Sequence, residues 1–251
     1  MSHDVYLTER AKWDDLARRR SNISEDVPYQ DIHDYARRVY TMSGISEFLG
    51  PLDGQRVLEI GCGRGLLTVL AAKSGANVTG LDLSARSVSL ARQRAVLHGV
   101  SNRVNFVVTV GETLPFPTES FDVVIGKAVL HHLDTTLGPP ELHRVLKTGG
   151  KAAFSEPMGT NPLLSFARDH VPYPRKNPRG ADHPLTYDDI QRWGAQYREY
   201  GYRELQFLSM LERALKIKRP LTLLRRLDDV LLEHLPFLRR YCRTVVLTMV
   251  K

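Results

Sequence analysis

The sequence predicts an α/β fold, in which a mostly parallel sheet carries helices on both of its faces. The length of 251 residues, of which 42% are apolar and 25% charged, suits one large globular domain. From residue 56 onward, short apolar runs alternate with helix-forming stretches, and a glycine-rich turn at residues 61–65 joins the first run to the first stretch. Strands that alternate with helices along a chain form parallel sheets, which are buried on both faces.

The central part of the chain repeats this strand–helix unit. Gly75 and Gly99 follow the first two helix-forming stretches and predict their ends, and Ser84 predicts the N-cap of the second. We expect strands at 56–60, 77–82, 104–108, 121–125 and 151–156, and helices at 66–73, 84–98 and 141–147.

The flanking segments add to this core. The spacing of apolar residues predicts helices at 5–20 and 29–49, and Thr186 predicts the N-cap of a helix that ends near residue 197. Prolines gather between residues 157 and 184, which is typical of a loop or lid. The remaining chain predicts a strand at 203–209, a helix at 211–240 and a closing strand at 243–250, which brings the sheet to seven strands.

Composition and charge limit the classes of function. The 35 Lys and Arg exceed the 28 Asp and Glu, and the net charge of +7 permits acidic partners without demanding a nucleic acid. Cys62 and Cys242 lie 180 positions apart, so neither a disulfide framework nor a cysteine-based zinc site is expected. The first residues lack an apolar signal core, and no apolar run of about 18 residues occurs, so we expect a cytoplasmic protein.

The glycine turn predicts a nucleotide-like cofactor. Glycines let backbone N–H groups and a helix N-terminus approach a ligand that a Cβ would exclude. The sequence Gly61-Cys62-Gly63-Arg64-Gly65 differs from the Gly-x-Gly-x-x-Gly spacing of dinucleotide folds. Asp82, at the end of the next strand, is placed to accept ribose hydroxyl protons, and Glu59 favours a cationic ligand over a diphosphate. Alternatively, the glycines only make a tight turn and Asp82 only caps the following helix.

Five motifs resemble the class I S-adenosylmethionine-dependent methyltransferases, in the small-molecule type 11 group that includes the ubiquinone/menaquinone type. They are VLEIGCGRG at 57–65, GLDLS at 80–84, GETLPF at 111–116, SFDVV at 120–124 and VLHHL at 129–133. The resemblance covers residues 54–157 and implies a Rossmann-like seven-stranded sheet with the topology of that class. It also implies S-adenosylmethionine as cofactor and S-adenosylhomocysteine as product.

The same resemblance assigns the cofactor contacts. It implies that Glu59 and the backbone of Gly61, Cys62, Gly63 and Gly65 hold the methionine end, that Asp82 binds the ribose and that Leu83 packs on the adenine. Where many relatives have an Asp for the adenine amino group, this chain has Val110, so Gly111 and Glu112 are the candidate substitutes. For Lys127, we expect contact through the backbone, because a charged side chain would oppose a sulfonium.

Candidate catalytic residues follow the fourth and fifth strands. His131 and His132 are expected to begin a helix after strand four, with His131 as the first choice for facing the substrate. In related methyltransferases of sugars and natural products, a histidine here and an acid after strand five approach the acceptor, which matches His131 and Glu156. Alternatively, both histidines only line the cofactor pocket. His170, Tyr173 and His183 are weaker candidates in the proline-rich segment, and no spacing predicts a metal site.

Taken together, residues 1–251 are interpreted as a single methyltransferase domain that acts on a small molecule. We expect a helical cap at 1–50, a cofactor-binding core at 54–157, a lid at 158–200, and C-terminal strands with a helical insertion at 201–251. An oxygen acceptor of a natural product or sugar-like substrate is the first choice. The alternatives are C-methylation of a quinone or lipid-like substrate, a non-catalytic cofactor-binding module, and a nicotinamide oxidoreductase.

The basic stretches outside the core are expected to be solvated faces. Leucines among the cations of residues 211–240 make an amphipathic surface helix conceivable, but packing against the sheet is favoured over membrane contact. Nucleic-acid binding is not favoured, because aromatic residues do not cluster among the basic ones. No sequence feature predicts an oligomeric state.

Overall fold

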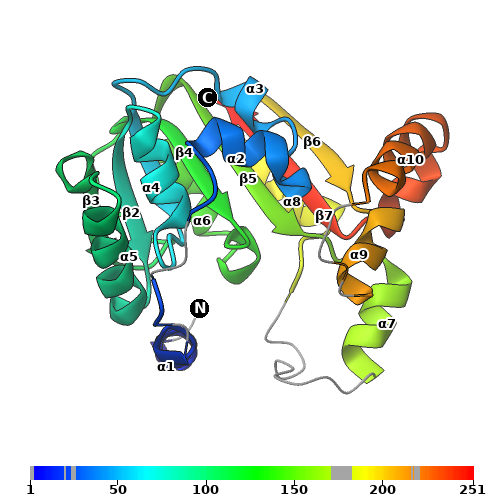
Figure 1. The fold of residues 1–251 in the computed structure, drawn as a ribbon, viewed down its shortest axis with the longest axis horizontal. Helices are drawn as coiled ribbons and strands as arrows, with labels where there is room; N and C mark the ends of the chain where they lie inside the picture. Colours follow the sequence, from blue (N-terminus) through cyan, green and yellow to red (C-terminus); the bar gives the residue numbers. More distant parts are fainter. Residues whose placement is uncertain (1–2, 20, 24–26, 171–182, 216, 218–220) are drawn as a thin grey trace.

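The computed structural model describes residues 3–19, 21–23, 27–170, 183–215, 217 and 221–251. Its centre is a seven-stranded sheet in the order β3-β2-β1-β4-β5-β7-β6, which confirms the predicted strand count (Figure 1). Strand β7 runs antiparallel to both neighbours and the other pairs are parallel. The strands are β1 (Arg56–Ile60), β2 (Asn77–Asp82), β3 (Val104–Val108), β4 (Phe121–Lys127), β5 (Leu146–Pro157), β6 (Glu199–Leu205) and β7 (Thr244–Val250).

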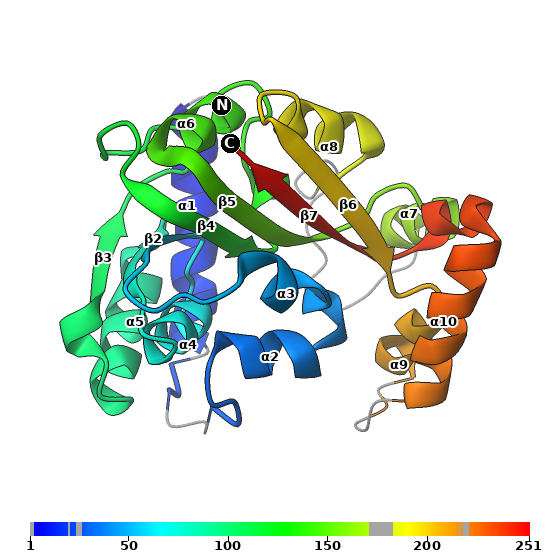
Figure 2. The ribbon, with the colours of Figure 1, turned by 90° about the horizontal axis from the view of Figure 1, so that it is seen from above.

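Two hydrophobic layers cover the two faces of the sheet (Figure 2). On one face lie α2 (Ile32–Arg38), α3 (Ile45–Leu49), α4 (Leu66–Lys73) and α5 (Ala85–Leu97), and on the other lie α6 (Gly138–Val145) and α8 (Tyr187–Gly194). Alternate residues of β1 serve the two layers, with Val57 in one and Leu58 in the other. The structure therefore has the predicted three-layer α/β architecture.

The predicted helix caps are confirmed. The Ser84 hydroxyl accepts the Ser87 N–H at 2.9 Å where α5 begins. Thr186 and Asp189 form a reciprocal capping box at the start of α8. Helix α1 (His3–Arg19) corresponds to the first predicted helix.

Three predicted helices have wrong boundaries. The helix expected at 29–49 is divided into α2, η1 (Tyr40–Met42) and α3, because Asp31 caps a new helix and Gly44 takes a left-handed φ of +85°. The helix expected at 141–147 begins at Gly138 because prolines are tolerated in a first turn, and Leu146 already belongs to β5. The helix expected at 211–240 is divided into α9 (Leu211–Ala214), α10 (Thr222–His234) and η5 (Pro236–Tyr241).

Two further predictions about the second half of the chain are wrong. The strand expected at 203–209 is β6 at Glu199–Leu205, because its register is set by pairing with β7 from Glu199↔Val250 to Leu205↔Thr244. The proline-rich stretch expected to be a loop contains α7 (Pro162–His170), whose first N–H groups donate to the Asn161 side chain. Short 3-10 helices η2 (Ser101–Arg103), η3 (Leu130–His132) and η4 (Leu208–Met210) complete the chain. Within the described residues, no helix is both long and apolar enough to cross a bilayer.

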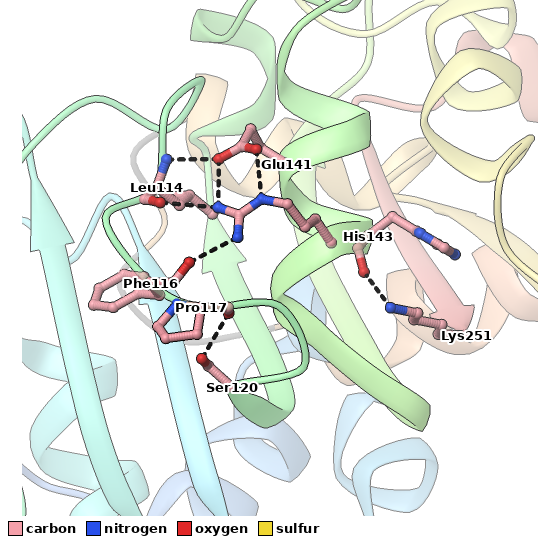
Figure 3. Close-up of polar contacts among 8 residues, drawn as sticks. Leu114, Phe116, Pro117, Ser120, Glu141, His143 and Lys251 are labelled. Atoms are coloured by element: carbon pink, nitrogen blue, oxygen red, sulfur yellow. Dashed lines mark hydrogen bonds and ion pairs between the residues drawn. The ribbon is translucent and has the colours of Figure 1, made fainter.

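A polar network fastens α6 to the loop between β3 and β4 (Figure 3). The Glu141 carboxylate accepts the Leu114 N–H at 2.8 Å. The Arg144 guanidinium donates to Glu141 at 2.7 Å and to the carbonyl oxygens of Leu114 and Phe116. Near the end of α6, the Lys251 ammonium donates to the His143 carbonyl oxygen at 2.9 Å. The network fixes the loop that also carries residues 111 and 112.

Candidate active site

Two adjoining cavities flank the glycine turn at the carboxyl end of β1. The first has a volume of about 300 Å³ and is lined by the ends of β1 and β2, the loop after β3, and one side of α1. The second has a volume of about 500 Å³ and is bordered by residues 27–29, Tyr35 and Glu59. Both cavities are lined by Gly61, Lys127 and Ala128. An elongated ligand can therefore lie across the turn, at the sheet edge where α/β folds bind ligands.

The backbone of the turn leaves room for a ligand. Gly63 has a φ of +50°, and a Cβ built on it would meet no atom within 4 Å. Gly65, with a φ of +75°, is needed for packing, because a Cβ there would lie 2.8 Å from that of Ala91 on α5. Cys62 is buried, and burial raises the pKa of its thiol well above the usual value. The turn thus combines an open position at Gly63 with close packing behind it.

Asp82 holds the turn from the end of β2. Its two carboxylate oxygens accept the Gly63 N–H at 2.8 Å and the Ser84 N–H at 2.9 Å. Burial raises the pKa of this carboxyl, while these two hydrogen bonds act in the opposite direction. Asp82 and Leu83 both line the first cavity. Because each carboxylate oxygen has two acceptor sites, Asp82 can also accept hydroxyl protons of a ligand.

Glu59 is a buried carboxyl beside the second cavity. It is 3% exposed and accepts a hydrogen bond from the Thr68 hydroxyl on α4. Burial raises the pKa of Glu59 to about 8, and the nearby Asp82 carboxylate contributes to the rise. A cation in the cavity would favour the ionised form of this side chain.

Lys127 ends β4 where the two cavities meet. Its ammonium donates to the Tyr35 hydroxyl at 2.7 Å, and burial lowers the pKa of Lys127 to about 8. The next residue, Ala128, takes a φ of +54°, which is an uncommon conformation for a residue with a Cβ. The side chain of Lys127 is therefore directed to α2, and the strained backbone beside it lines both cavities.

Helix α1 forms a wall of the first cavity that the sequence reasoning missed. Tyr6, Glu9 and Trp13 line the cavity, and the Trp13 indole N–H donates to Glu9 at 2.9 Å. Asp14 accepts hydrogen bonds from the Ser84 hydroxyl at 2.5 Å and the Arg86 N–H at 3.2 Å, which ties α1 to the start of α5. The helical spacing of Tyr6, Glu9 and Trp13 was the available signal, because it places them on one face.

Gly111 and Glu112 also line the first cavity. Glu112 is buried and accepts the Asp134 N–H at 3.1 Å. Burial and the Glu112 carboxylate together raise the pKa of the Tyr6 hydroxyl. Glu112 therefore already has protein partners, while Val110 lines the cavity at the position where the resemblance expected an acid.

The structure brings His131 and Glu156 together. The Glu156 carboxylate is 1% exposed and accepts the N–H groups of Val129 at 2.9 Å and Leu130 at 3.1 Å. Its other oxygen lies 2.8 Å from His131 Nδ1. The expected helix is wrong here, because both histidines lie in the 3-10 turn η3.

The second histidine, His132, faces the first cavity. It lines the cavity, its ring packs 3.9 Å from that of His131, and Trp13 of α1 contacts it edge-on at 5.3 Å between ring centroids. A row of three side chains in contact therefore leads from the interior to the cavity wall. A hydrogen bond joins the Glu156 carboxylate to the His131 ring, and ring packing joins His131 to His132.

The weaker candidates that the structure describes do not line either cavity. His170 and His183 are exposed, and Tyr173 lies outside the described residues. In the described ranges, no group of three His, Cys, Asp or Glu side chains is arranged to hold a metal ion.

Comparisons with known proteins agree with this geometry. Residues 58–154 match the family model described as "Methyltransferase domain", of type 11. A ubiquinone biosynthesis O-methyltransferase of Sinorhizobium medicae is 32% identical over 57% of this chain and 62% of its own length. An aklanonic acid methyltransferase of Streptomyces sp. is 36% identical over 45% of this chain and 54% of its own length. The chain thus spans between about half and three fifths of the length of these relatives.

Solved structures share the fold. A geranyl diphosphate C-methyltransferase of Streptomyces coelicolor superposes with a TM-score of 0.67 over 98% of this chain and 97% of its own, at 15% identity. A Haemonchus contortus phosphoethanolamine N-methyltransferase gives a TM-score of 0.61 over 84% of this chain and 52% of its own, at 20% identity. At these identities, the likeness concerns the fold.

The strand order, the glycine turn and the acid after β2 define a class I S-adenosylmethionine-dependent methyltransferase domain. Within the chain, residues 58–154 match the type 11 methyltransferase domain of that class.

Proposed function

We propose that this protein transfers a methyl group from S-adenosylmethionine to a small-molecule acceptor and releases S-adenosylhomocysteine. The observation that carries the proposal is the Asp82 carboxylate, bound to the Gly63 N–H at 2.8 Å beside the open position of the turn. When bound, the cofactor supplies an electrophilic methyl group on a sulfonium, which is a good leaving group. The residues of this chain bind and orient the two reactants.

The cofactor roles follow the two cavities. Asp82 accepts ribose hydroxyl protons, and Leu83 packs on the adenine in the first cavity. Gly111 lines the same cavity, and Glu112 supports its wall through Tyr6 and Asp134. The backbone of residues 61–65 carries the ligand across the turn, toward Glu59. Glu59 attracts the cationic methionine end in its ionised form. Lys127 contributes its backbone, because its ammonium is held by Tyr35.

The acceptor-side roles rest on the chain of Glu156, His131 and His132. Glu156 fixes the His131 ring through Nδ1, so that Nε2 is the nitrogen that takes a proton. His132 packs against the His131 ring, lines the first cavity and contacts the acceptor or cofactor. An oxygen nucleophile is the acceptor for which such a base is useful, because its proton must leave as the methyl–oxygen bond forms. The name of the S. medicae relative, an O-methyltransferase, supports the same choice.

A labelled-cofactor screen tests the proposal. Purified protein is incubated with S-adenosylmethionine carrying a labelled methyl group and with phenols, sugars, carboxylic acids and quinone precursors in turn. We expect label in an oxygen-methylated product and a large loss of turnover in His131→Ala, while calorimetry shows cofactor affinity retained. Label on carbon would favour C-methylation. Tight cofactor binding with no turnover on any acceptor would favour a binding module.

A further inference from the structure

Exposed apolar side chains are concentrated at one corner of the molecule. Within the described part of the chain, ten of the seventeen exposed large hydrophobic side chains lie in α7 or between residues 211 and 237. Leu163, Phe166, Leu223 and Phe237 are each more than 60% exposed. Figures 1 and 2 both place α7, α9 and α10 together, beyond the β6 side of the sheet. We call α7, α9, α10 and η5 the apolar corner.

Hydrogen bonds hold the apolar corner together. The Thr160 hydroxyl donates to the Arg240 carbonyl oxygen at 2.8 Å, and the Asn161 amide donates to that of Tyr241 at 2.6 Å. These contacts join the start of α7 to the end of η5. The exposed side chains therefore belong to one connected surface.

Helix α10 is apolar on the face that points away from the protein. Leu223, Leu227 and Val230 are 68%, 40% and 54% exposed, and their spacing of four and three residues places them on one stripe. The opposite face is already packed, since Leu232 is buried and the buried Asp228 carboxylate accepts the N–H groups of residues 207–209. A helix with one packed face normally presents polar residues on the other.

Helix α10 itself carries two Arg against three Asp and Glu, and the excess of positive charge lies in the sequence that flanks it. Residues 211–241 carry eight Lys and Arg against four Asp and Glu. Three of the four acids have partners within the protein: Asp228 is buried, Asp229 forms an exposed ion pair with Arg203 at 3.0 Å, and Glu212 pairs with Arg225 at 2.9 Å. A surface segment that presents arginines beside exposed leucines matches anionic lipid headgroups above an apolar layer. A second copy of this chain would bring like charge to the same face.

We propose that the apolar corner docks on the surface of an anionic lipid bilayer, with α10 lying in the interfacial plane. Its 13 residues give a helix of about 20 Å, which suits a helix that lies on the surface. Helix α7 follows β5 with four intervening residues, so the docked corner lies at the sheet edge that carries the candidate active site. The proposal concerns a second surface and does not depend on methyl transfer.

Vesicle co-sedimentation tests this docking. The full chain is mixed with vesicles of phosphatidylcholine alone or of phosphatidylcholine with phosphatidylglycerol. We expect binding to the anionic vesicles that weakens with salt, and a loss of about tenfold or more in Leu223→Gln/Val230→Gln. The matched control is Val96→Gln/Leu97→Gln on α5, where the wild-type side chains are 71% and 57% exposed, and it should bind as the wild type does.

Two further measurements separate docking from misfolding and self-association. Thermal unfolding must give similar midpoints for both double variants, and light scattering gives the mass of each protein in solution. Arg226→Gln/Arg240→Gln should lose the salt-sensitive part of the binding. Failure of the wild type to sediment with anionic vesicles would overturn the proposal. Equal binding by Leu223→Gln/Val230→Gln and by Val96→Gln/Leu97→Gln would also overturn it. A dimer that Leu223→Gln/Val230→Gln converts to a monomer would assign the corner to self-association instead.

Discussion

The substitution Glu156→Gln tests whether His131 acts as the base, because it changes which nitrogen of the His131 ring carries the proton. In the wild type, one Glu156 oxygen accepts the Val129 and Leu130 N–H groups, and the other accepts the proton on His131 Nδ1. A glutamine keeps an oxygen for the two backbone groups, so the turn stays in place. Its amide nitrogen, however, presents a donor to Nδ1. The His131 proton then moves to Nε2, which can no longer act as a base.

The expected loss is large and specific. A fixed base contributes about 10²–10⁴-fold to a proton transfer, so kcat should fall within that range, while the affinity for S-adenosylhomocysteine stays within about twofold. Adding His131→Ala to Glu156→Gln should lower kcat little further, because both substitutions remove the same base. The assay is steady-state methyl transfer to an acceptor from the screen, with calorimetry for the cofactor. An unchanged kcat in a folded Glu156→Gln protein would refute the proposed role of His131 as the base.

Three further predictions concern the cofactor cavities. Burial raises the pKa of Glu59 from 4.5 to about 8, so its stabilisation is present below pH 4.5 and is lost as the pH rises through 8. The wild type should lose up to about 4 kcal/mol of unfolding free energy between pH 5 and 8.5 from this group, and Glu59→Gln should remove that loss, as measured by urea unfolding. Gly63→Ala should weaken cofactor binding in calorimetry, whereas Gly99→Ala, also at positive φ with open space, should not. Asp14→Ala should speed S-adenosylhomocysteine dissociation in stopped-flow fluorescence, because α1 loses its tie to α5, whereas Asp15→Ala should leave the rate unchanged.

The parallel core of the fold could be predicted because each strand is a short apolar run with local punctuation. The boundaries of β1, β2 and β3 agree with the sequence prediction, and Ser84 caps α5 as expected. The predicted bounds of the edge strand β6 were wrong by four residues. Its register depends on pairing with β7, a contact that the local sequence does not show. Its exposed Tyr200 and Tyr202 also obscure the alternating pattern of a half-buried strand.

The parts of the candidate site that could be predicted are those where a sequence motif lies at the end of a predicted strand. Asp82 and the glycine turn lie together, and so do His131 and Glu156, as strand order in a parallel sheet requires. The helical spacing of Tyr6 and Trp13 places them on one face of α1, but nothing local shows that this face packs against the cavity. The turn conformation of the two histidines was also missed, because the left-handed Ala128 ends β4 in a way that its residue type does not indicate.

Calorimetric titration of wild type, Asp82→Asn and Asp82→Ala with S-adenosylhomocysteine tests the central claim most directly. Hydrogen bonds to a charged group contribute about 1.5–3 kcal/mol each, so the loss of two such bonds to ribose should weaken binding by about 100-fold or more in Asp82→Ala. Both variants must remain folded by circular dichroism. The account predicts this loss together with no heat of binding for NAD. Equal affinity in all three proteins, or binding of NAD in place of S-adenosylhomocysteine, would contradict it.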